Sequence, residues 1–163
     1  MNPKFVSPGL WLSIASGSLA AGLTGLPVRA AADDPASEPA IARTADDAGL
    51  AWGGCPEFLP AGCAIAVLHG DPSQPNVDIF FRVPAKSEIA SHTHTSPERM
   101  VLIAGEMQVT YEGQAAVRLT PGTYAYGPAG RAHHASCLSD APCVLFIGFE
   151  SPLDATPAGA TGR

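Results

Sequence analysis

Four residues with metal-binding side chains lie in two short stretches of this sequence. His92 and His94 are followed by Glu98 in the first stretch, and His133 lies in the second. Side chains two positions apart in a β-strand point to the same face, so His92 and His94 would project together. Three imidazole nitrogens and one carboxylate oxygen suit Fe(II), Mn(II), Ni(II), Co(II) or Zn(II). The sequence therefore predicts a site for one divalent transition metal ion, provided that the strands carrying both stretches pair.

The residues around these two stretches are expected to form short β-strands. Gly or Pro recurs about every 8–12 residues between Trp52 and Phe149, and the runs between these turn residues are rich in β-branched and aromatic side chains. No stretch sustains the three-to-four-residue apolar spacing of a helix. Pro128 and Gly130 would form a tight connection that directs the strand beginning at His133. These features predict an all-β sandwich or barrel.

Composition divides the chain into four parts. Residues 1–32 combine the basic Lys4, an apolar run and the small residues Ala30–Ala32, which is the order of a signal peptide. A membrane anchor is the alternative, but the run is short and contains several glycines. Residues 33–50 are predicted to be a flexible acidic lead-in, residues 51–150 the barrel domain, and residues 151–163 a flexible C-terminal tail.

The charge of the chain excludes one class of partner. Loss of residues 1–32 would remove Lys4 and Arg29 and change the formal net charge from −6 to −8. An acidic chain without a basic stripe repels phosphate backbones, so no nucleic-acid binding is expected. The predicted partner is a small-molecule ligand or substrate. The expected location is periplasmic or secreted, with no stable membrane span after removal of the signal peptide.

The four cysteines form an even set without a C-x-x-C pair. With an export signal, this pattern favours disulfides over metal ligation. Four cysteines allow three pairings, and the predicted one is Cys55–Cys63 with Cys137–Cys143, since each bond closes a short loop. Free buried thiols are the alternative.

Two sequence patterns resemble the motifs of the cupin superfamily. They are His92-x-His94-x3-Glu98-x6-Gly105 and Gly122-x5-Pro128-x-Gly130-x2-His133. The resemblance spans roughly residues 52–149 and implies a double-stranded β-helix, or jelly roll, with a metal ion held by His92, His94, Glu98 and His133. It also implies a homodimer.

The sequence departs from the superfamily's motifs at two positions. Lys86 stands where the first motif usually begins with Gly, and Cys137 stands where the second usually ends with Asn. Neither is a ligand position, so the expected metal site is unaffected.

Three further residues are candidates for substrate binding. Arg82 would hold a carboxylate by paired hydrogen bonds if its face of the strand points inward. The alternative for Arg82 is a salt bridge at the sheet margin. Tyr124 and Tyr126 share a face, and either would line a pocket or simply pack.

Several functions are compatible with the expected metal site. Its open coordination positions suit O₂ and an organic substrate, and resemblance to cupins implies a dioxygenase acting on phenolic, thiol or dicarbonyl compounds. A metal-dependent isomerase or lyase is the second hypothesis. A non-catalytic periplasmic module that binds a small ligand is the third, because fold alone does not choose among them.

Overall fold

The structure, a computed structural model, describes residues 38–159. The predicted signal peptide, residues 1–32, lies outside this range. The chain divides into two units, Met1–Ala40 and Ile41–Arg163, and all the described strands belong to the second. These strands are β1 Trp52–Gly54, β2 Ala64–His69, β3 Val77–Val83, β4 Glu88–Thr93, β5 Glu98–Ala104, β6 Met107–Tyr111, β7 Val117–Leu119, β8 Tyr124–Gly127, β9 His133–Cys137, β10 Cys143–Phe149 and β11 Thr156–Pro157.

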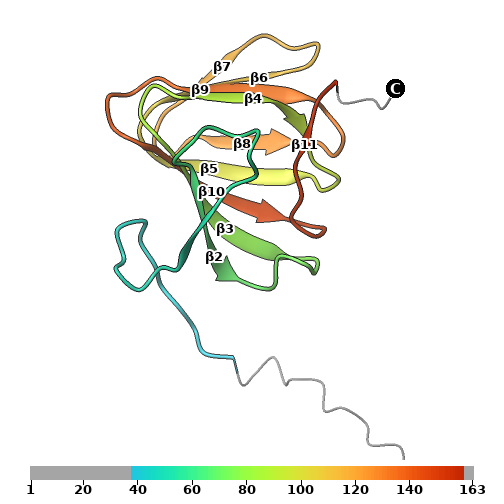
Figure 1. The fold of residues 1–163 in the computed structure, drawn as a ribbon. Coiled ribbons are helices and arrows are strands. Elements are labelled where there is room, and N and C mark those ends of the chain that lie inside the picture. The colour runs from blue at the N-terminus through green and yellow to red at the C-terminus, as the bar shows by residue number, and fades with distance from the viewer. Residues whose placement is uncertain (1–37, 160–163) are drawn as a thin grey trace, which may run out of the picture. The chain divides into compact units, whose positions relative to one another are not determined.

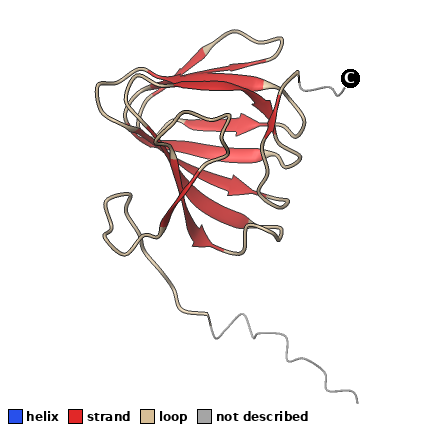
Figure 2. Cartoon of the chain, viewed as in Figure 1, coloured by secondary structure: helices blue, strands red, loops and turns tan. Residues whose placement is uncertain are grey.

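The strands form two antiparallel sheets (Figure 1). One has the order β1-β2-β3-β10-β5-β8, and the other has the order β11-β4-β9-β6-β7. From β3 to β6 each strand lies in the sheet opposite to the strand before it, which is the winding of a double-stranded β-helix. Residues 38–159 contain strands, turns and loops but no helix (Figure 2), so none of them forms a helix able to cross a membrane. The predicted all-β jelly roll is confirmed.

The core lies between the sheets and follows from the alternation of side chains along each strand. In β5, Glu98, Met100 and Leu102 are buried, whereas Arg99 and Ile103 are exposed. In β9, His133 and Ala135 are buried in the same way. One row of inward side chains therefore supplies both apolar packing and polar donors. Full burial of one large apolar side chain contributes roughly 1.5–3 kcal/mol.

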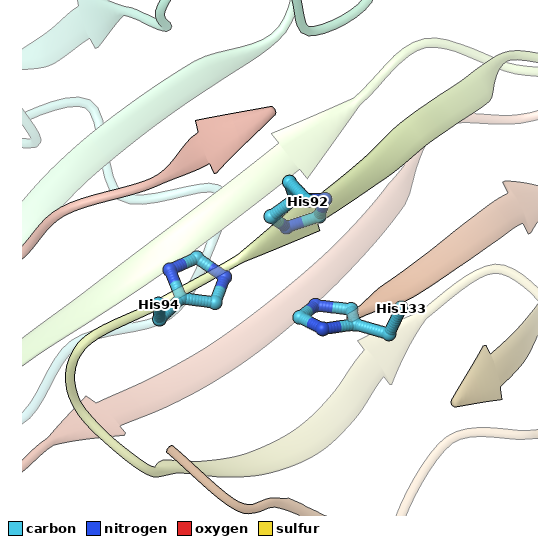
Figure 3. A group of neighbouring side chains, drawn as sticks. All are labelled: His92, His94 and His133. Atoms are coloured by element: carbon cyan, nitrogen blue, oxygen red, sulfur yellow. The ribbon is translucent and has the colours of Figure 1, made fainter. Parts of the chain in front are cut away.

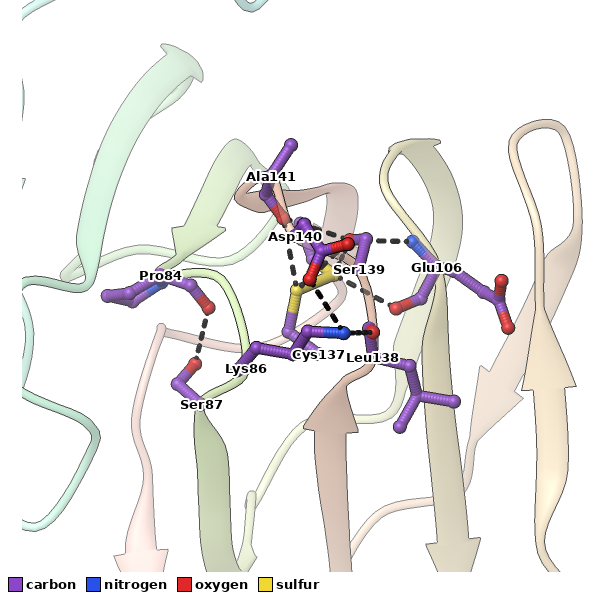
Figure 4. Close-up of a disulfide and its surroundings, with 10 residues drawn as sticks. Pro84, Lys86, Ser87, Glu106, Cys137, Leu138, Ser139, Asp140 and Ala141 are labelled. Carbon is purple, nitrogen blue, oxygen red and sulfur yellow. Dashed lines mark hydrogen bonds and ion pairs between the residues drawn. A yellow bond between two sulfur atoms is a disulfide. The ribbon is translucent and has the colours of Figure 1, made fainter.

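One end of the barrel is fastened by the disulfide between Cys137 and Cys143, which is the predicted pairing. Lys86 Nζ donates to the Leu138 carbonyl oxygen at 2.7 Å and lies 3.0 Å from the Asp140 carboxylate, so it holds the loop that this disulfide closes (Figure 4). Lys86 also has a positive φ of 54°, a conformation that Gly adopts most readily. The two departures from the motifs, Lys86 and Cys137, thus belong to one local structure.

Gly105 at the same end has no room for a side chain. Its φ is +83°, and a Cβ there would lie 2.9 Å from the Cys143 sulfur and from the Ser139 hydroxyl oxygen. The end of β5 therefore packs directly against the disulfide loop. Directly before β2, Cys63 is bonded to Cys55, which closes the loop between β1 and β2 as predicted.

The chain after residue 150 contacts the barrel. Thr156 and Pro157 form β11 and pair with β4, opposite Thr93 and His92. The Leu153 amide donates to the Pro72 carbonyl at 2.9 Å, and the Ala158 amide donates to the Ser91 carbonyl at 2.8 Å. The predicted domain boundary at residue 150 therefore stops short of the packed chain. The sequence of residues 153–158 gives no sign of this, because it has no apolar alternation.

Candidate metal centre

Three histidine rings converge between the sheets (Figure 3). His92 lies in β4, His94 directly follows β4, and His133 begins β9. Antiparallel pairing of β4 with β9 places His92 opposite His133. One ring nitrogen from each histidine lies within 4.8 Å of those of the other two. The three residues are 6%, 9% and 7% exposed, so two distant parts of the sequence meet at one buried point.

Glu98 approaches this point from the opposite sheet. It begins β5, which pairs with β8 and β10. One carboxylate oxygen lies 3.2 Å from His94 Nε2, and the other lies 3.4 Å from His133 Nε2. Glu98 as a whole is only 3% exposed. The structure therefore brings all four predicted donors together.

The hydrogen bonds of the three rings turn one nitrogen of each toward the shared point. His92 Nδ1 is 2.7 Å from the Ala90 carbonyl oxygen, and His133 Nδ1 is 3.2 Å from that of Arg131. His94 Nδ1 bonds to the carbonyl oxygen of Asp154, in the segment before β11. A carbonyl only accepts, so each Nδ1 carries the proton and each Nε2 presents a lone pair. This is the arrangement that outer hydrogen bonds give to metal-binding histidines.

The donor atoms fit a cation. His94 Nε2 and Glu98 Oε2 are buried without a hydrogen-bond partner. Burial lowers the pKa of His94 and of His133 to about 4, so both rings are neutral near pH 7. Burial also raises the pKa of Glu98 to about 8, because the charged carboxylate loses its hydration inside the barrel. A divalent ion would pair with these lone pairs and stabilise the carboxylate, which is how metal binding displaces protons.

Tyr111 is a neighbour of the site that the sequence did not single out. It ends β6 directly opposite His133, and the two ring centroids are 5.1 Å apart. Its buried hydroxyl has no hydrogen-bond partner. A Cβ on Gly127 would lie 2.9 Å from this oxygen and 3.0 Å from Glu98 Oε2, so both oxygens border the same glycine. Burial first, and then the charge of Glu98, raise the pKa of Tyr111. Tyr111 follows Met107 and Val109 at alternate positions of β6, so the sequence indicates that it faces inward. This alternation does not indicate that its hydroxyl has a function.

A cavity of about 280 Å³ adjoins the donors. Its polar lining comes from His92, His94, Glu98 and Asp154. Its apolar lining comes from the β1–β2 loop, the inner face of the first sheet and the segment before β11: Pro56, Leu59, Ile65, Ile79, Phe81, Ile147, Phe149, Leu153 and Ala155. The volume lies slightly below the roughly 300–1,000 Å³ of pockets for drug-sized ligands. The site can therefore admit a small organic molecule.

The structure does not bring the three predicted substrate-binding residues to this cavity. Ile79 and Phe81 take the inward positions of β3, which leaves Arg82 on the outer face. The Arg82 guanidinium lies 4.0 Å from the centre of the Trp52 ring, a cation–π contact. Tyr124 and Tyr126 are 60% and 51% exposed on the edge strand β8. The inward orientation that carboxylate binding by Arg82 would require is therefore not met, because Ile79 and Phe81 take the inward positions of β3.

Comparison with solved structures shows the same fold in several proteins. The DMSP lyase DddQ from Ruegeria pomeroyi DSS-3 superposes with a TM-score of 0.60 at 22% identity, over 78% of this chain and 76% of that chain. A chain from the structures of the DMSP lyases RdDddP and RnDddQII gives 0.59 at 16% identity, over 67% of this chain and 62% of its own. A cupin 2 conserved barrel domain protein from Rhodopseudomonas palustris gives a TM-score of 0.57 at 14% identity, over 69% of this chain and 79% of that chain.

Sequence comparison identifies the family. No curated protein matches the chain. The family described as the ChrR Cupin-like domain matches residues 43–151, which is more than half of the chain and includes all four donors. Together with the double-stranded β-helix, this match confirms the predicted cupin resemblance. The chain belongs to the ChrR cupin-like family of the cupin superfamily.

Proposed function

We propose that this protein is a mononuclear metal enzyme in which His92, His94, Glu98 and His133 hold one divalent transition metal ion. The observation that carries the proposal is the meeting of unprotonated Nε2 atoms and a carboxylate in a buried space. The two Glu98 oxygens lie 3.2 Å from His94 Nε2 and 3.4 Å from His133 Nε2. Without a cation between them, these lone pairs repel one another or Glu98 must keep its proton.

The reaction that we favour is oxidation of a small organic substrate by O₂. A bound iron ion would supply an electron donor and a template that brings O₂ and substrate together. The chain's own residues do the rest. The apolar walls around Phe81 and Phe149 exclude water, and the Asp154 carbonyl fixes the orientation of the His94 ring.

Lyase chemistry is the second candidate, and Tyr111 favours it. Its unpaired hydroxyl lies beside Glu98, and its ring packs on His133, so it would hold a proton next to the donors. Two of the similar structures are of DMSP lyases, although their low identity carries only the fold. In a lyase the ion would act as a Lewis acid.

Metal exchange distinguishes the two candidates. We would remove metal with a chelator, reload the protein anaerobically with Fe(II), and measure O₂ uptake with phenols, thiols and dicarbonyl compounds. The dioxygenase proposal expects uptake with Fe(II) and none with Zn(II). Turnover without O₂, supported equally by Zn(II) and Mn(II), would instead identify a lyase. Tight zinc binding without turnover of any compound would contradict both enzymes and leave a binding module.

We also propose that the protein works in an oxidising compartment, periplasmic or secreted. The two disulfides support this, because such bonds persist where thiols are not kept reduced. Fractionation of cells that express the full chain, with mass determination of the exported form, tests the location and the predicted cleavage after residue 32.

A further inference from the structure

The lining of the 280 Å³ cavity restricts the charge of its ligand. Of the described residues that line it, two are acidic, Glu98 and Asp154, and none is lysine or arginine. Arg82, which was a candidate for binding a carboxylate, lies outside it against Trp52. An anionic group buried without a cationic partner loses hydration that nothing replaces. Only the metal ion would compensate negative charge here.

Part of the positive charge of the metal ion would already be balanced by the protein. Glu98 contributes one negative charge to the donor set, so a divalent ion leaves room for about one more anionic group. Asp154 lies at the cavity as well, where its carboxylate accepts from the Thr95 amide at 2.9 Å. A second anionic group on the ligand would therefore lie among apolar walls and an acid.

The segment before β11, residues 153–155, forms one wall of the cavity. Leu153 and Ala155 line the cavity, and Asp154 between them holds His94 and Thr95 by its carbonyl and carboxylate oxygens. Pairing of β11 with β4 and the bond from Leu153 to Pro72 fix the segment at both ends. The side chains at 153 and 155 are therefore held at the cavity rather than being free to turn away.

We propose that residues 153–155 shape this site for a small ligand with a single metal-binding group and an uncharged apolar body, and that they select against a second anionic group. The inference rests on the proposed metal site. It assigns a specificity-determining role to a segment that carries no metal donor, and it defines the substrate class as small, compact and at most singly anionic.

The test uses two hydroxamates of matched shape with the full exported chain loaded with Co(II). Butanohydroxamate ends in a methyl group, and succinomonohydroxamate replaces that methyl with a carboxylate. Co(II) stoichiometry is measured first, and hydroxamate binding is then followed by the visible absorption of the ion. We expect butanohydroxamate to bind at least ten-fold more tightly. Equal or tighter binding of succinomonohydroxamate would overturn the inference while leaving the metal site intact. Failure to bind Co(II) would instead count against the proposed function.

Variants locate the selectivity. Leu153→Arg would place a cation at the wall, and we expect the preference for butanohydroxamate to fall at least ten-fold. Ala155→Lys makes the same change at the neighbouring lining residue, if Leu153→Arg does not fold. Val117→Arg, on a half-exposed position of β7 away from the cavity, is the matched control and should leave the preference unchanged. An unchanged preference in a folded, Co(II)-loaded variant at 153 or 155 would show that this wall does not set the selectivity.

Discussion

The two ends of the β4–β9 strand pair treat their polar groups in opposite ways. At one end, Glu88 lies opposite Ser136, and the disulfide loop is closed by paired contacts such as Lys86 with Leu138 and Asp140. At the other end, His92 lies opposite His133, and buried polar atoms of His94, Glu98 and Tyr111 have no partner. Among the described residues, Glu106 Oε1 also has no hydrogen-bond partner, but it forms an ion pair with the Arg118 guanidinium.

This difference separates scaffold from site. A buried polar atom without a partner costs about 1–3 kcal/mol, so a natural protein keeps one where it has a use. The end with the Cys137–Cys143 disulfide, which we call the closed end, fixes the strands by a covalent bond and satisfied hydrogen bonds. The end with His92 and His133, the open end, leaves buried polar atoms unsatisfied, and the proposed metal ion would pair with them. The departures from the superfamily's motifs, Lys86 and Cys137, both lie at the closed end. They therefore change the contacts that hold the disulfide loop and leave the four predicted metal ligands unchanged.

The largest expected effect comes from removing a donor at the open end. In His133→Ala, one nitrogen is lost and the Glu98 carboxylate loses a neighbour at 3.4 Å. We expect metal affinity to fall at least 100-fold, because three donors rarely match four for a divalent ion in water. Calorimetric titration with Zn(II) and elemental analysis measure the change. The fold should survive, because this side chain does not hold the strands together. Circular dichroism should therefore show an unchanged strand content.

His134→Ala is the control for that experiment. His134 is the next residue in β9, is exposed and points to the opposite face. It should leave metal stoichiometry and affinity unchanged. If His133→Ala also bound metal at the original stoichiometry and affinity, the open end would not be a metal centre, and its unpaired atoms would need another explanation.

An intermediate effect is expected from opening the closed end. The double variant Cys137→Ser, Cys143→Ser removes a bond with a sequence separation of 6 residues. Loop entropy for so short a loop predicts a loss of about 2 kcal/mol in the free energy of unfolding. Chemical denaturation measures it. Zn(II) affinity of the folded variant should change less than three-fold, because the donors lie at the other end. A ten-fold loss of affinity would show that the two ends are coupled.

The sequence identified most of the open end because its signals are local. The i, i+2 spacing of His92 and His94 and the turn before His133 each depend only on neighbouring residues, and strand pairing then brings them together. The pairing of the cysteines was also predicted, from the short loop that each bond closes, and both bonds are present.

The parts that the sequence missed depend on distant contacts. Which face of β3 points inward is set by packing against the other sheet, and this excluded Arg82 from the cavity. Asp154 bonds to His94 across 60 positions, which no local pattern reveals. Tyr111 carries no signal of a polar role in the sequence, and only its position opposite His133 and beside Gly127 shows its polar surroundings.

The smallest expected effect concerns the metal-free protein and its dependence on pH. The pKa of Glu98 is raised from 4.5 to about 8 by burial, so its stabilising contribution is complete below pH 4.5 and is lost as pH rises toward 8. The pKa values of His94 and His133 are lowered from 6.5 to about 4, so their contributions are complete above pH 6.5 and are lost as pH falls. Between pH 4.5 and 6.5 the two histidines outweigh the one glutamate. Stability should therefore peak near pH 6.5.

Thermal melting of the chelated protein between pH 5 and 9 measures this profile. The raised pKa of Glu98 corresponds to a loss of about 2 kcal/mol from pH 6.5 to 8. Since 1 kcal/mol lowers the melting temperature of a domain of about 100 residues by roughly 4–8 °C, we expect a fall of about 10 °C. Glu98→Gln removes the titrating carboxyl and should abolish this alkaline decline while retaining the acid one. Bound Zn(II) should also abolish it, because the ion compensates the carboxylate charge. An unchanged alkaline decline in Glu98→Gln would mean that the unpaired carboxylate of the open end is not what distinguishes it from the closed end.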